Sequence, residues 1–327
     1  MTARRRLWIA AAAVAALGAG AQSAHATAPG HNGRIAFRRF LDPDRTHGAI
    51  FTINPDGSAE RQASNPPADA SDDFPDVAAD SSVIAFQRCR DFCQVVVARL
   101  DGSGAHPVGP GCGAGQAPPA CIHSYYVALS PDVKRIAFIG AWGDIEGDAI
   151  AHQDIFTMRV DGSHVRRVTA SPLRGTVYGE PQWSPDGRRL VFVRYEEDGN
   201  QALVTADADG RHQRRVTPWS LHAGDGPDWS PDGSRILFRS PENDDFLNSN
   251  LFTIRADGHG LRQITHVAPD TKLYSASFSP DGTQITFGML GIGGLADIYR
   301  MRADGSAIAP VTRTPFHDSA PDWGGLR

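Results

Sequence analysis

The amino-acid sequence predicts an all-β protein, a six-bladed β-propeller with four antiparallel strands in each blade. Three observations lead to this prediction: two short phrases recur at a nearly constant interval, apolar runs of strand length separate them, and incomplete units at the two ends complement each other. An interval of about 40 to 50 residues is typical of propeller blades. The chain of 327 residues also holds 34 Gly and 23 Pro, which supply the many turns of such a fold.

The first phrase is an aromatic residue followed by Ser-Pro-Asp-Gly. It stands at Trp183–Gly187, Trp229–Gly233 and Phe278–Gly282, with altered copies at Leu129–Asp132 and Val77–Asp80. In a type I turn, serine suits the first position, proline presets φ at the second, and glycine accepts a positive φ at the end. The phrase therefore predicts a tight turn between strand a, which ends at the aromatic residue, and strand b.

The second phrase is an Asp-Gly pair, which is typical of tight β-hairpins. Successive pairs stand 45, 60, 48, 48 and 47 residues apart, so the unit length is nearly constant. The pairs occupy positions 56–57, 101–102, 161–162, 209–210, 257–258 and 304–305. We expect each pair to join strand c to strand d.

Apolar runs around these turns define the other strands. Runs that precede Asp-Gly, such as Phe51–Ile53 and Leu251–Ile254, predict strand c. Runs that end in Thr, such as Val168–Thr169 and Ile264–Thr265, predict strand d. Six runs that end in Phe predict strand b: Ile35–Phe37, Ile84–Phe86, Ile136–Phe138, Leu190–Phe192, Ile236–Phe238 and Ile285–Phe287.

The two ends of the chain supply the parts of one blade. The first unit enters at strand b, Gly33–Phe37, and the last residues, Ser319–Gly324, form a strand a with no strand b after it. We therefore expect the C-terminal strand a to join the N-terminal strands b to d, which closes the ring without a long exposed sheet edge. The propeller domain is expected to span residues 33–327.

Residues 1–26 have the features of a secretory signal peptide. Arginines at positions 4–6 precede an apolar run, 7–20, and Ala24–Ala26 has the Ala-x-Ala form of a cleavage site. We expect an exported protein, secreted or periplasmic, whose mature chain begins with the short segment 27–32. An uncleaved N-terminal anchor is the alternative, and the sequence leaves both the Sec and the twin-arginine export routes open. No later run approaches about 18 apolar residues, so no membrane span is expected after cleavage.

The charge balance bears on the class of partner. The formal net charge is −5 at pH 7, and the predicted signal peptide removes only cationic residues from this balance. Binding to nucleic acid depends on clustered positive charge, so a nucleic-acid partner is not expected. We expect a monomer that binds a protein or a cell-envelope component.

The four cysteines lie in two irregular loops. Pairing within each loop, Cys89 with Cys93 and Cys112 with Cys121, is the simplest of the three possible connectivities. In an oxidising compartment such disulfides would tether loops that have little core of their own. A zinc site with four thiolate ligands is the alternative.

Strand alternation places the loops on two faces. The turn face carries the a–b and c–d turns, which are short and uniform, and the loop face carries the b–c and d–a connections. Recognition usually lies on variable loops that a rigid scaffold displays, so we expect it on the loop face, with Trp142 and Phe246 as contact residues. The irregular insertions of the loop face are 40–48, 89–93, 110–121, 140–153, 195–200, 240–250 and 288–296.

Polar residues precede strand a in every blade and are expected to surround the mouth of the central channel. Such a mouth suits a polar ligand or the basic end of a peptide, and a divalent cation is the alternative; no bound cofactor or metal is predicted. The repeated aromatic residues themselves, Trp183, Trp229, Phe278 and Trp323, are expected in the core between blades. The candidate binding residues are Asp72, Asp73, His123, Tyr125, Tyr178, Glu180, His222, Asp225, Tyr274, His317 and Asp318.

The repeat resembles the WD40-like Pro-Asp repeat of TolB-like β-propellers. The resemblance rests on Trp183–Gly187 and its copies, on the apolar strand and Asp-Gly pair that follow, and on the terminal Pro321–Trp323. It implies a propeller that binds partners. TolB also carries an α/β domain before its propeller, and only the segment 27–32 separates the predicted signal peptide from the first strand, so we expect the propeller alone.

No motif for a nucleophile or a metalloprotease occurs in the chain: it has neither Gly-x-Ser-x-Gly nor His-Glu-x-x-His. We therefore predict an exported, non-enzymatic binding propeller that recognises a protein or a cell-envelope polymer on its loop face. The alternative is a metal-assisted carbohydrate-binding or polysaccharide-lyase type of propeller. Its metal would lie at the channel mouth near His123, His222 and His317, with Tyr125 or Tyr178 as base.

Overall fold

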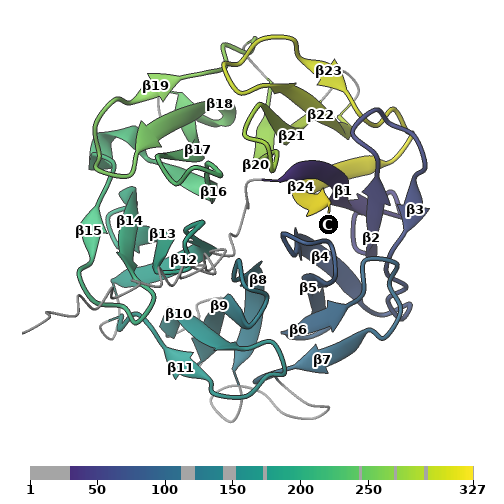
Figure 1. The fold of residues 1–327 in the computed structure, drawn as a ribbon, viewed down its shortest axis with the longest axis horizontal. Coiled ribbons are helices and arrows are strands. Elements are labelled where there is room, and N and C mark those ends of the chain that lie inside the picture. The colour runs from purple at the N-terminus through teal and green to yellow at the C-terminus, as the bar shows by residue number, and fades with distance from the viewer. Residues whose placement is uncertain are drawn as a thin grey trace, which may run out of the picture.

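The computed structural model describes residues 30–111, 122–142, 152–171, 175–242, 245–268, 271–290 and 294–326. Six sheets, each of four antiparallel strands, surround a central axis (Figure 1), which confirms the predicted six-bladed propeller. The predicted signal peptide, Cys112 and Cys121 lie outside the described residues.

The first three blades contain the following strands in the order of the sheet. Blade 1 consists of β24 (His317–Leu326), β1 (His31–Phe40), β2 (Gly48–Ile53) and β3 (Arg61–Gln62). Blade 2 consists of β4 (Ser71–Val77), β5 (Ile84–Cys89), β6 (Cys93–Ala98) and β7 (His106–Val108). Blade 3 consists of β8 (His123–Leu129), β9 (Arg135–Trp142), β10 (His152–Arg159) and β11 (Arg166–Arg167).

The remaining blades repeat this pattern. Blade 4 consists of β12 (Thr176–Trp183), β13 (Arg189–Glu196), β14 (Gln201–Asp207) and β15 (Arg214–Arg215). Blade 5 consists of β16 (Gly224–Trp229), β17 (Arg235–Glu242), β18 (Asp245–Arg255) and β19 (Arg262–Gln263). Blade 6 consists of β20 (Leu273–Phe278), β21 (Gln284–Leu290), β22 (Ala296–Arg302) and β23 (Ala309–Pro310).

Blade 1 is shared between the two ends of the chain, as predicted. The C-terminal β24 pairs antiparallel with β1, and its register places Trp323 opposite Ile35 and His317 opposite Phe40. This pairing closes the ring, because it gives β1 a neighbour on the side of the channel.

The core lies between blades. Trp183 and Trp229 are 1% and 0% exposed, and the indole of Trp183 donates a hydrogen bond to the carbonyl of Ala128 in the preceding blade (3.2 Å). Phe278 and Trp323 are also buried. The expectation that these repeated aromatic residues form the core between blades is confirmed.

Strand d is shorter than the sequence suggested. It contains two residues in five of the six blades and ends before the apolar–Thr pair that was expected to belong to it. The apolar residue of the pair still donates its backbone N–H to strand c, as Val168 does to Ile155 (2.8 Å). The hydroxyl of the following threonine accepts the N–H of that same strand c residue: Thr169 from Ile155 (3.0 Å) and Thr217 from Leu203 (2.9 Å). The repeated Thr therefore ends the outer strand instead of extending it.

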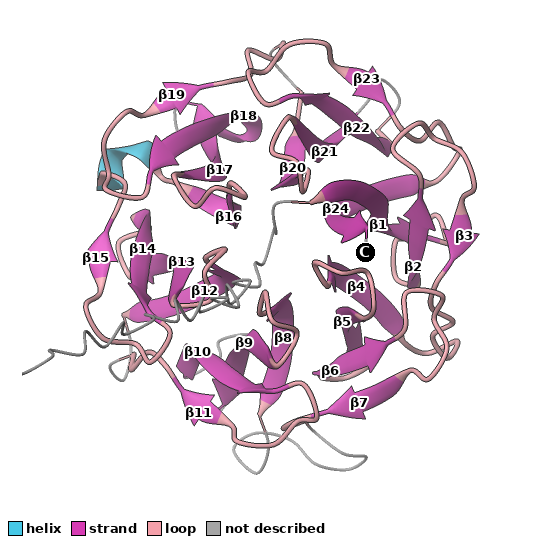
Figure 2. Ribbon diagram, in the orientation of Figure 1, coloured by secondary structure: helices cyan, strands magenta, loops and turns pink. Residues whose placement is uncertain are grey.

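The described residues are almost entirely strand and loop (Figure 2). The only helix among them is a single 3₁₀ turn, Trp219–Leu221. Within this described part of the chain, no helix has the length and apolar character needed to cross a membrane.

Candidate functional site

Strand a of every blade contains a β-bulge before its aromatic end. The register shifts between Asp73 and Asp76 in blade 2 and between Tyr125 and Ala128 in blade 3, with corresponding shifts in the other blades. A bulge re-aims the side chain of its extra residue. The φ angle is +46° at Phe74 and positive at four corresponding residues. Six residues, one from each blade, form the bulge ring that lines the channel: Phe74, Tyr126, Glu180, Gly226, Ser275 and Ala320.

The bulge ring also lines a pocket of about 160 Å³ at the channel mouth, on the loop face. We call it the mouth pocket. Its other lining residues include three cationic side chains, Arg38, Arg239 and Lys272, together with Tyr274 and Ser319. Glu180 is the one anionic side chain among its described lining residues, so the pocket favours an anionic group over a cation.

A second pocket of about 70 Å³ is lined by the bulge ring on one side and by Asp76, Asp228 and Asp322 on the other. Each of these buried carboxylates accepts a backbone N–H from the next blade: Asp76 from Leu129 (2.9 Å), Asp228 from Phe278 (2.7 Å), and Asp322 from the corresponding residue of blade 2 (2.7 Å). Burial raises the pKa of Asp228 to about 7 and that of Asp322 to about 6. These aspartates link neighbouring blades and line the channel beyond the bulge ring, as seen from the mouth pocket.

Two of the predicted binding residues, Glu180 and Tyr274, line the mouth pocket. Glu180 is 8% exposed and accepts hydrogen bonds from the backbone N–H of Gly226 (2.5 Å) and the hydroxyl of Tyr195 (3.2 Å). Burial raises the pKa of Glu180. Its carboxylate is therefore held in place by contacts from two blades.

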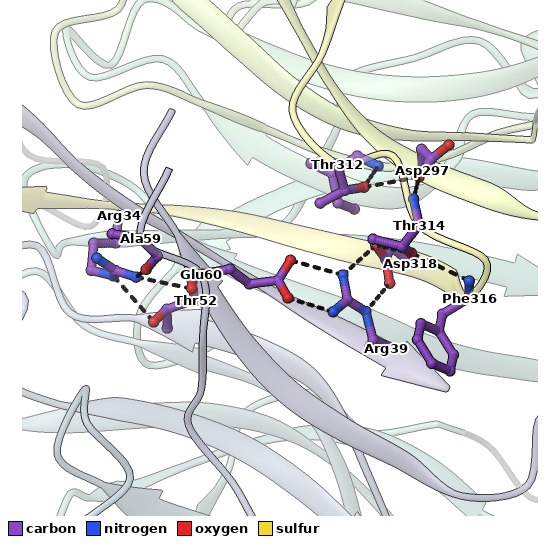
Figure 3. A network of polar contacts seen from close by, with 11 residues as sticks. Arg34, Arg39, Thr52, Ala59, Glu60, Asp297, Thr312, Thr314, Phe316 and Asp318 are labelled. Carbon is purple, nitrogen blue, oxygen red and sulfur yellow. Dashed lines mark hydrogen bonds and ion pairs between the residues drawn. The ribbon is translucent and has the colours of Figure 1, made fainter. Parts of the chain in front are cut away.

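Three predicted carboxylates are held by arginines. Asp72 is fully buried and receives two hydrogen bonds from Arg88 (2.6 and 2.7 Å), and Asp73 forms an ion pair with Arg38. Asp318 is also fully buried, and it accepts hydrogen bonds from Arg39, which in turn pairs with Glu60 (Figure 3). These ion pairs explain why the mouth is less acidic than the sequence suggested.

The three predicted histidines lie in different environments. His123 is half-buried against the rings of Phe92 and Tyr125, and burial lowers its pKa. His222 caps the 3₁₀ turn in the left-handed conformation, with φ +45°. His317 is 4% exposed, and burial, followed by nearby cationic side chains, lowers its pKa to about 4. Among the described residues, no group of three His, Cys, Asp or Glu side chains is arranged to hold a metal ion.

The aromatic residues that were predicted to contact a partner pack against other residues of the propeller. The hydroxyl of Tyr125 donates to Gln153 (2.6 Å), and Tyr178 is 6% exposed with its ring edge-on to Phe192. Trp142 is half-buried, stacks on His152 with 5.1 Å between ring centroids, and lies under the guanidinium of Arg167. Phe246 lies on β18 and Asp225 on β16, and their side chains lie outside the described part of the structure.

One of the two predicted disulfides lies in the described residues. Cys89 and Cys93 are bonded and occupy opposite positions at the ends of β5 and β6. The disulfide closes the b–c loop of blade 2 on the loop face. The predicted pairing of Cys112 with Cys121 stays a prediction.

Sequence reasoning missed the cations of the mouth pocket and most of the bulge ring. Except for Glu180, the predicted residues lie four to seven positions before the aromatic end of strand a, whereas the bulge brings the residue three positions before it into the channel. The sequence does contain a signal for two of these cationic residues. Arg38 and Arg239 both directly follow the repeated Phe of strand b, at equivalent positions of blades 1 and 5.

Larger hollows lie on the turn face, between the turns of adjacent blades. One of about 720 Å³ lies between blades 3 and 4 and is lined by residues such as Lys134, Arg159 and Asp209. Another of about 530 Å³ lies between blades 5 and 6, around Pro231 and Asp281. Equivalent turns form both hollows, so the hollows are a consequence of the repeat itself. The mouth pocket is therefore the more specific site.

The comparisons with known proteins agree with the fold. A sequence family described as the TolB beta propeller domain matches residues 135–325. TolB from Acinetobacter baumannii superposes with a TM-score of 0.69 at 17% identity, covering 91% of this chain and 68% of its own. A TolB-like protein from Agrobacterium tumefaciens gives 0.65 at 18% identity, covering 88% of this chain and 91% of its own.

Propellers with other activities share the fold as well. An oligogalacturonate lyase from Vibrio parahaemolyticus has a TM-score of 0.55 at 10% identity, covering 88% of this chain and 77% of its own. At these identities the solved structures establish the fold alone. No curated protein sequence matches the chain significantly. The family match covers more than half of the chain, and its repeats build the closed ring described above, so the chain belongs to the TolB beta propeller domain family.

Proposed function

We propose that this chain is an exported, non-enzymatic binding propeller that recognises a protein or a cell-envelope polymer on its loop face. One observation carries the proposal. Within the described residues, the mouth pocket opens on the same face as the b–c and d–a connections, and the opposite face repeats the same short turns from blade to blade.

The rigidity of the scaffold supports this function. The residues behind the mouth pocket are fixed by buried ion pairs and by the aspartates that link neighbouring blades. A site held in one geometry loses little conformational entropy when a partner binds. The propeller thus presents a preformed surface, whose specificity comes from its loops.

A blocking experiment tests the proposal. A cysteine replaces one exposed residue on each face, Asp44→Cys on the loop face and Lys134→Cys on the turn face, and each is coupled to a polyethylene glycol chain. Immobilised protein is incubated with envelope extract, and captured proteins and amino sugars are identified by mass spectrometry. The loop-face label is expected to abolish capture, while the turn-face label and mock-labelled wild type leave it unchanged. Capture that resists the loop-face label would refute the proposal.

The lyase alternative receives less support from the described residues. His317 is buried, His222 caps a turn and His123 packs against aromatic rings, and among the described residues they belong to no group of His, Cys, Asp or Glu side chains that could hold a metal ion. Metal analysis of protein purified without chelator tests this alternative. Stoichiometric manganese, zinc or calcium that is lost in His123→Ala and His222→Ala would favour the lyase type.

A further inference from the structure

The hollow between blades 3 and 4 on the turn face has a lining that departs from the repeat, although its position follows from the repeat. Its volume of about 720 Å³ is typical of sites for small molecules. The lining residues belong to strand c and the two turns of blade 3 and to the c–d turn of blade 4. We call this hollow the blade 3 hollow.

The first departure is an apolar floor. Val133 stands in the a–b turn, Val160 directly precedes the Asp-Gly pair, and both are half-buried beside the buried Met158. Blades 4, 5 and 6 have glycine at the first of these positions and alanine at the second: Gly187, Gly233 and Gly282, and Ala208, Ala256 and Ala303. Blade 3 therefore has larger apolar side chains than these blades at both positions.

The second departure is the backbone conformation of Val133. Its φ angle is +56°, whereas the glycines at the corresponding positions of blades 4, 5 and 6 have φ of +64°, +68° and +70°. A β-branched residue is a strained exception in this left-handed region, and glycine would form the same turn without strain. Strain of this kind is concentrated at functional sites. The turn itself does not require the valine, so we assign its side chain to the hollow.

The third departure leaves the hollow open. In blade 5 the first arginine of strand b, Arg235, reaches strand c and donates to the hydroxyl of Thr253 (3.3 Å). In blade 3 the corresponding Arg135 instead donates to the carbonyl of Gly187 in blade 4 (2.9 Å). Thr157, the counterpart of Thr253, lines the hollow, and no described arginine donates to its hydroxyl.

The fourth departure is a cation without a partner. In blades 4 and 5 the first arginine of strand d donates to the backbone carbonyl of the next Asp-Gly pair: Arg214 to Asp257 (2.7 Å) and Arg262 to Asp304 (3.4 Å). Arg166 holds the same position in blade 3 and lines the hollow. Its guanidinium forms no hydrogen bond or ion pair with any described residue.

The other charges at the blade 3 hollow largely offset one another. Three cations lie close to three carboxylates: Lys134 to Asp132, Arg159 to Asp161, and Arg211 to Asp209 (3.5 Å). Two cations remain, Arg135 and Arg166. Because Arg135 is bound to blade 4 and lies over the indole of Trp183, Arg166 is the cation available to a ligand.

We propose that the blade 3 hollow binds a small amphipathic anion, a molecule with an apolar ring system or short chain and one anionic group. The apolar part packs on Val133, Met158 and Val160. The anionic group accepts paired hydrogen bonds from the guanidinium of Arg166. This site lies on the turn face, so it goes beyond the recognition proposed for the loop face. One available cation favours one anionic group over a polyanion.

Isothermal titration calorimetry of the full chain with 2-naphthalenesulfonate tests the charge requirement. We expect one sulfonate to bind per chain, about tenfold more tightly than the neutral 2-naphthalenesulfonamide. Arg166→Gln should weaken binding of the sulfonate about tenfold and leave binding of the sulfonamide unchanged. Arg214→Gln, the matched substitution in blade 4, should leave binding of both probes unchanged.

A second variant tests the apolar floor. Val133→Gly combined with Val160→Ala introduces the residues of blades 4 to 6, and it should fold because it removes the left-handed valine. It should weaken binding of both probes about tenfold. Val165→Ala is the control, because Val165 is exposed in the same blade outside the hollow. Thermal melts check each fold, and Arg166→Gln alone decides if the double variant unfolds.

Three results would overturn the inference: no saturable binding of the sulfonate, equal affinity for sulfonate and sulfonamide, or unchanged binding by a folded double variant. A wild-type dimer that the double variant dissociates would also overturn it, since a second copy would then occupy the hollow. Analytical ultracentrifugation measures this state. Capture from envelope extracts that still responds to the Asp44→Cys label would leave the proposed function standing after any of these failures.

Discussion

At the scale of single residues, buried charge separates structural carboxylates from those available to a ligand. Asp72 and Asp318 are fully buried, and each binds one arginine through two nitrogen atoms. Arg39 also contacts Glu60, so one guanidinium joins the inner strand of blade 1 to its outer turn (Figure 3). These carboxylates looked like ligands in the sequence because their arginine partners are distant along the chain.

Removal of Arg39 should therefore destabilise the protein strongly. Arg39→Ala leaves the buried Asp318 without its partner, a change that typically costs about 3 to 5 kcal/mol. The matched control is Arg90→Ala, because Arg90 and Asp69 form an ion pair with side chains 54% and 63% exposed. Such surface pairs contribute about 0 to 1 kcal/mol. Urea denaturation measures both free energies of unfolding, and similar losses would contradict the structural role given to Arg39.

The channel aspartates should make stability depend on pH. The pKa of Asp228 is about 7 in the folded chain, above the value of about 3.9 expected in the unfolded chain. The unfolded state therefore releases this proton first, and the stability contribution, complete below about pH 4, is lost as the pH rises to 7. Asp228→Asn keeps an oxygen acceptor for the N–H of Phe278 and should lose less stability between pH 4 and 7 than wild type. Thermal melts across this range measure the difference; parallel curves would refute the assignment.

At the scale of the blade, the glycine of the repeated Asp-Gly pair has a second structural role, in the packing between blades, which the sequence did not predict. A Cβ atom on Gly305 would lie 1.7 Å from the carbonyl oxygen of Ile264 in the preceding blade. Gly210 and Gly102 approach the preceding blade in the same way, each at 2.0 Å from a carbonyl oxygen. The glycine therefore both turns the hairpin and lets adjacent blades pack closely, and every blade has it.

Alanine substitutions separate these two effects. Gly305 and Gly199 both have positive φ, +92° and +83°, but a Cβ on Gly199 meets nothing within 4 Å. Gly199→Ala should cost about 1 to 2 kcal/mol from backbone strain alone. Gly305→Ala should cost about 1 to 3 kcal/mol more, since blade 5 and blade 6 must move apart. Chemical denaturation of the two variants checks this order; equal losses would show that blade contact does not contribute.

At the scale of the whole molecule, the ring depends on β24. Its pairing with β1 places Trp323 in the core with Ile35 and Phe37 and protects the edge of β1. The carboxylate of Asp322 also accepts the backbone N–H of Val77 in blade 2. The last strand therefore contacts both the first and the second blade.

A chain that ends at residue 314 should lose its cooperative fold. Without β24 the ring is open, β1 presents an unpaired edge, and the core of blade 1 lacks its indole, so aggregation is expected. A chain that begins at residue 27 is the control and should melt like the full chain, because only the predicted signal peptide is removed. Size-exclusion chromatography and thermal melts check both. A shortened chain that stays monomeric with an unchanged melting temperature would contradict the role of β24.

The sequence by itself determined the number of blades, the turns, the aromatic core, the ring closure and the Cys89–Cys93 pair. Each of these follows from local chemistry that recurs in every unit or from residues close together in the chain. Only the tertiary structure decided which polar residues face the channel. A bulge moves the lining position by one residue, and arginines from other strands bind Asp72, Asp73 and Asp318. The same packing brings Phe40 and Ala296 into contact with His317, because blade 1 is built from both ends of the chain.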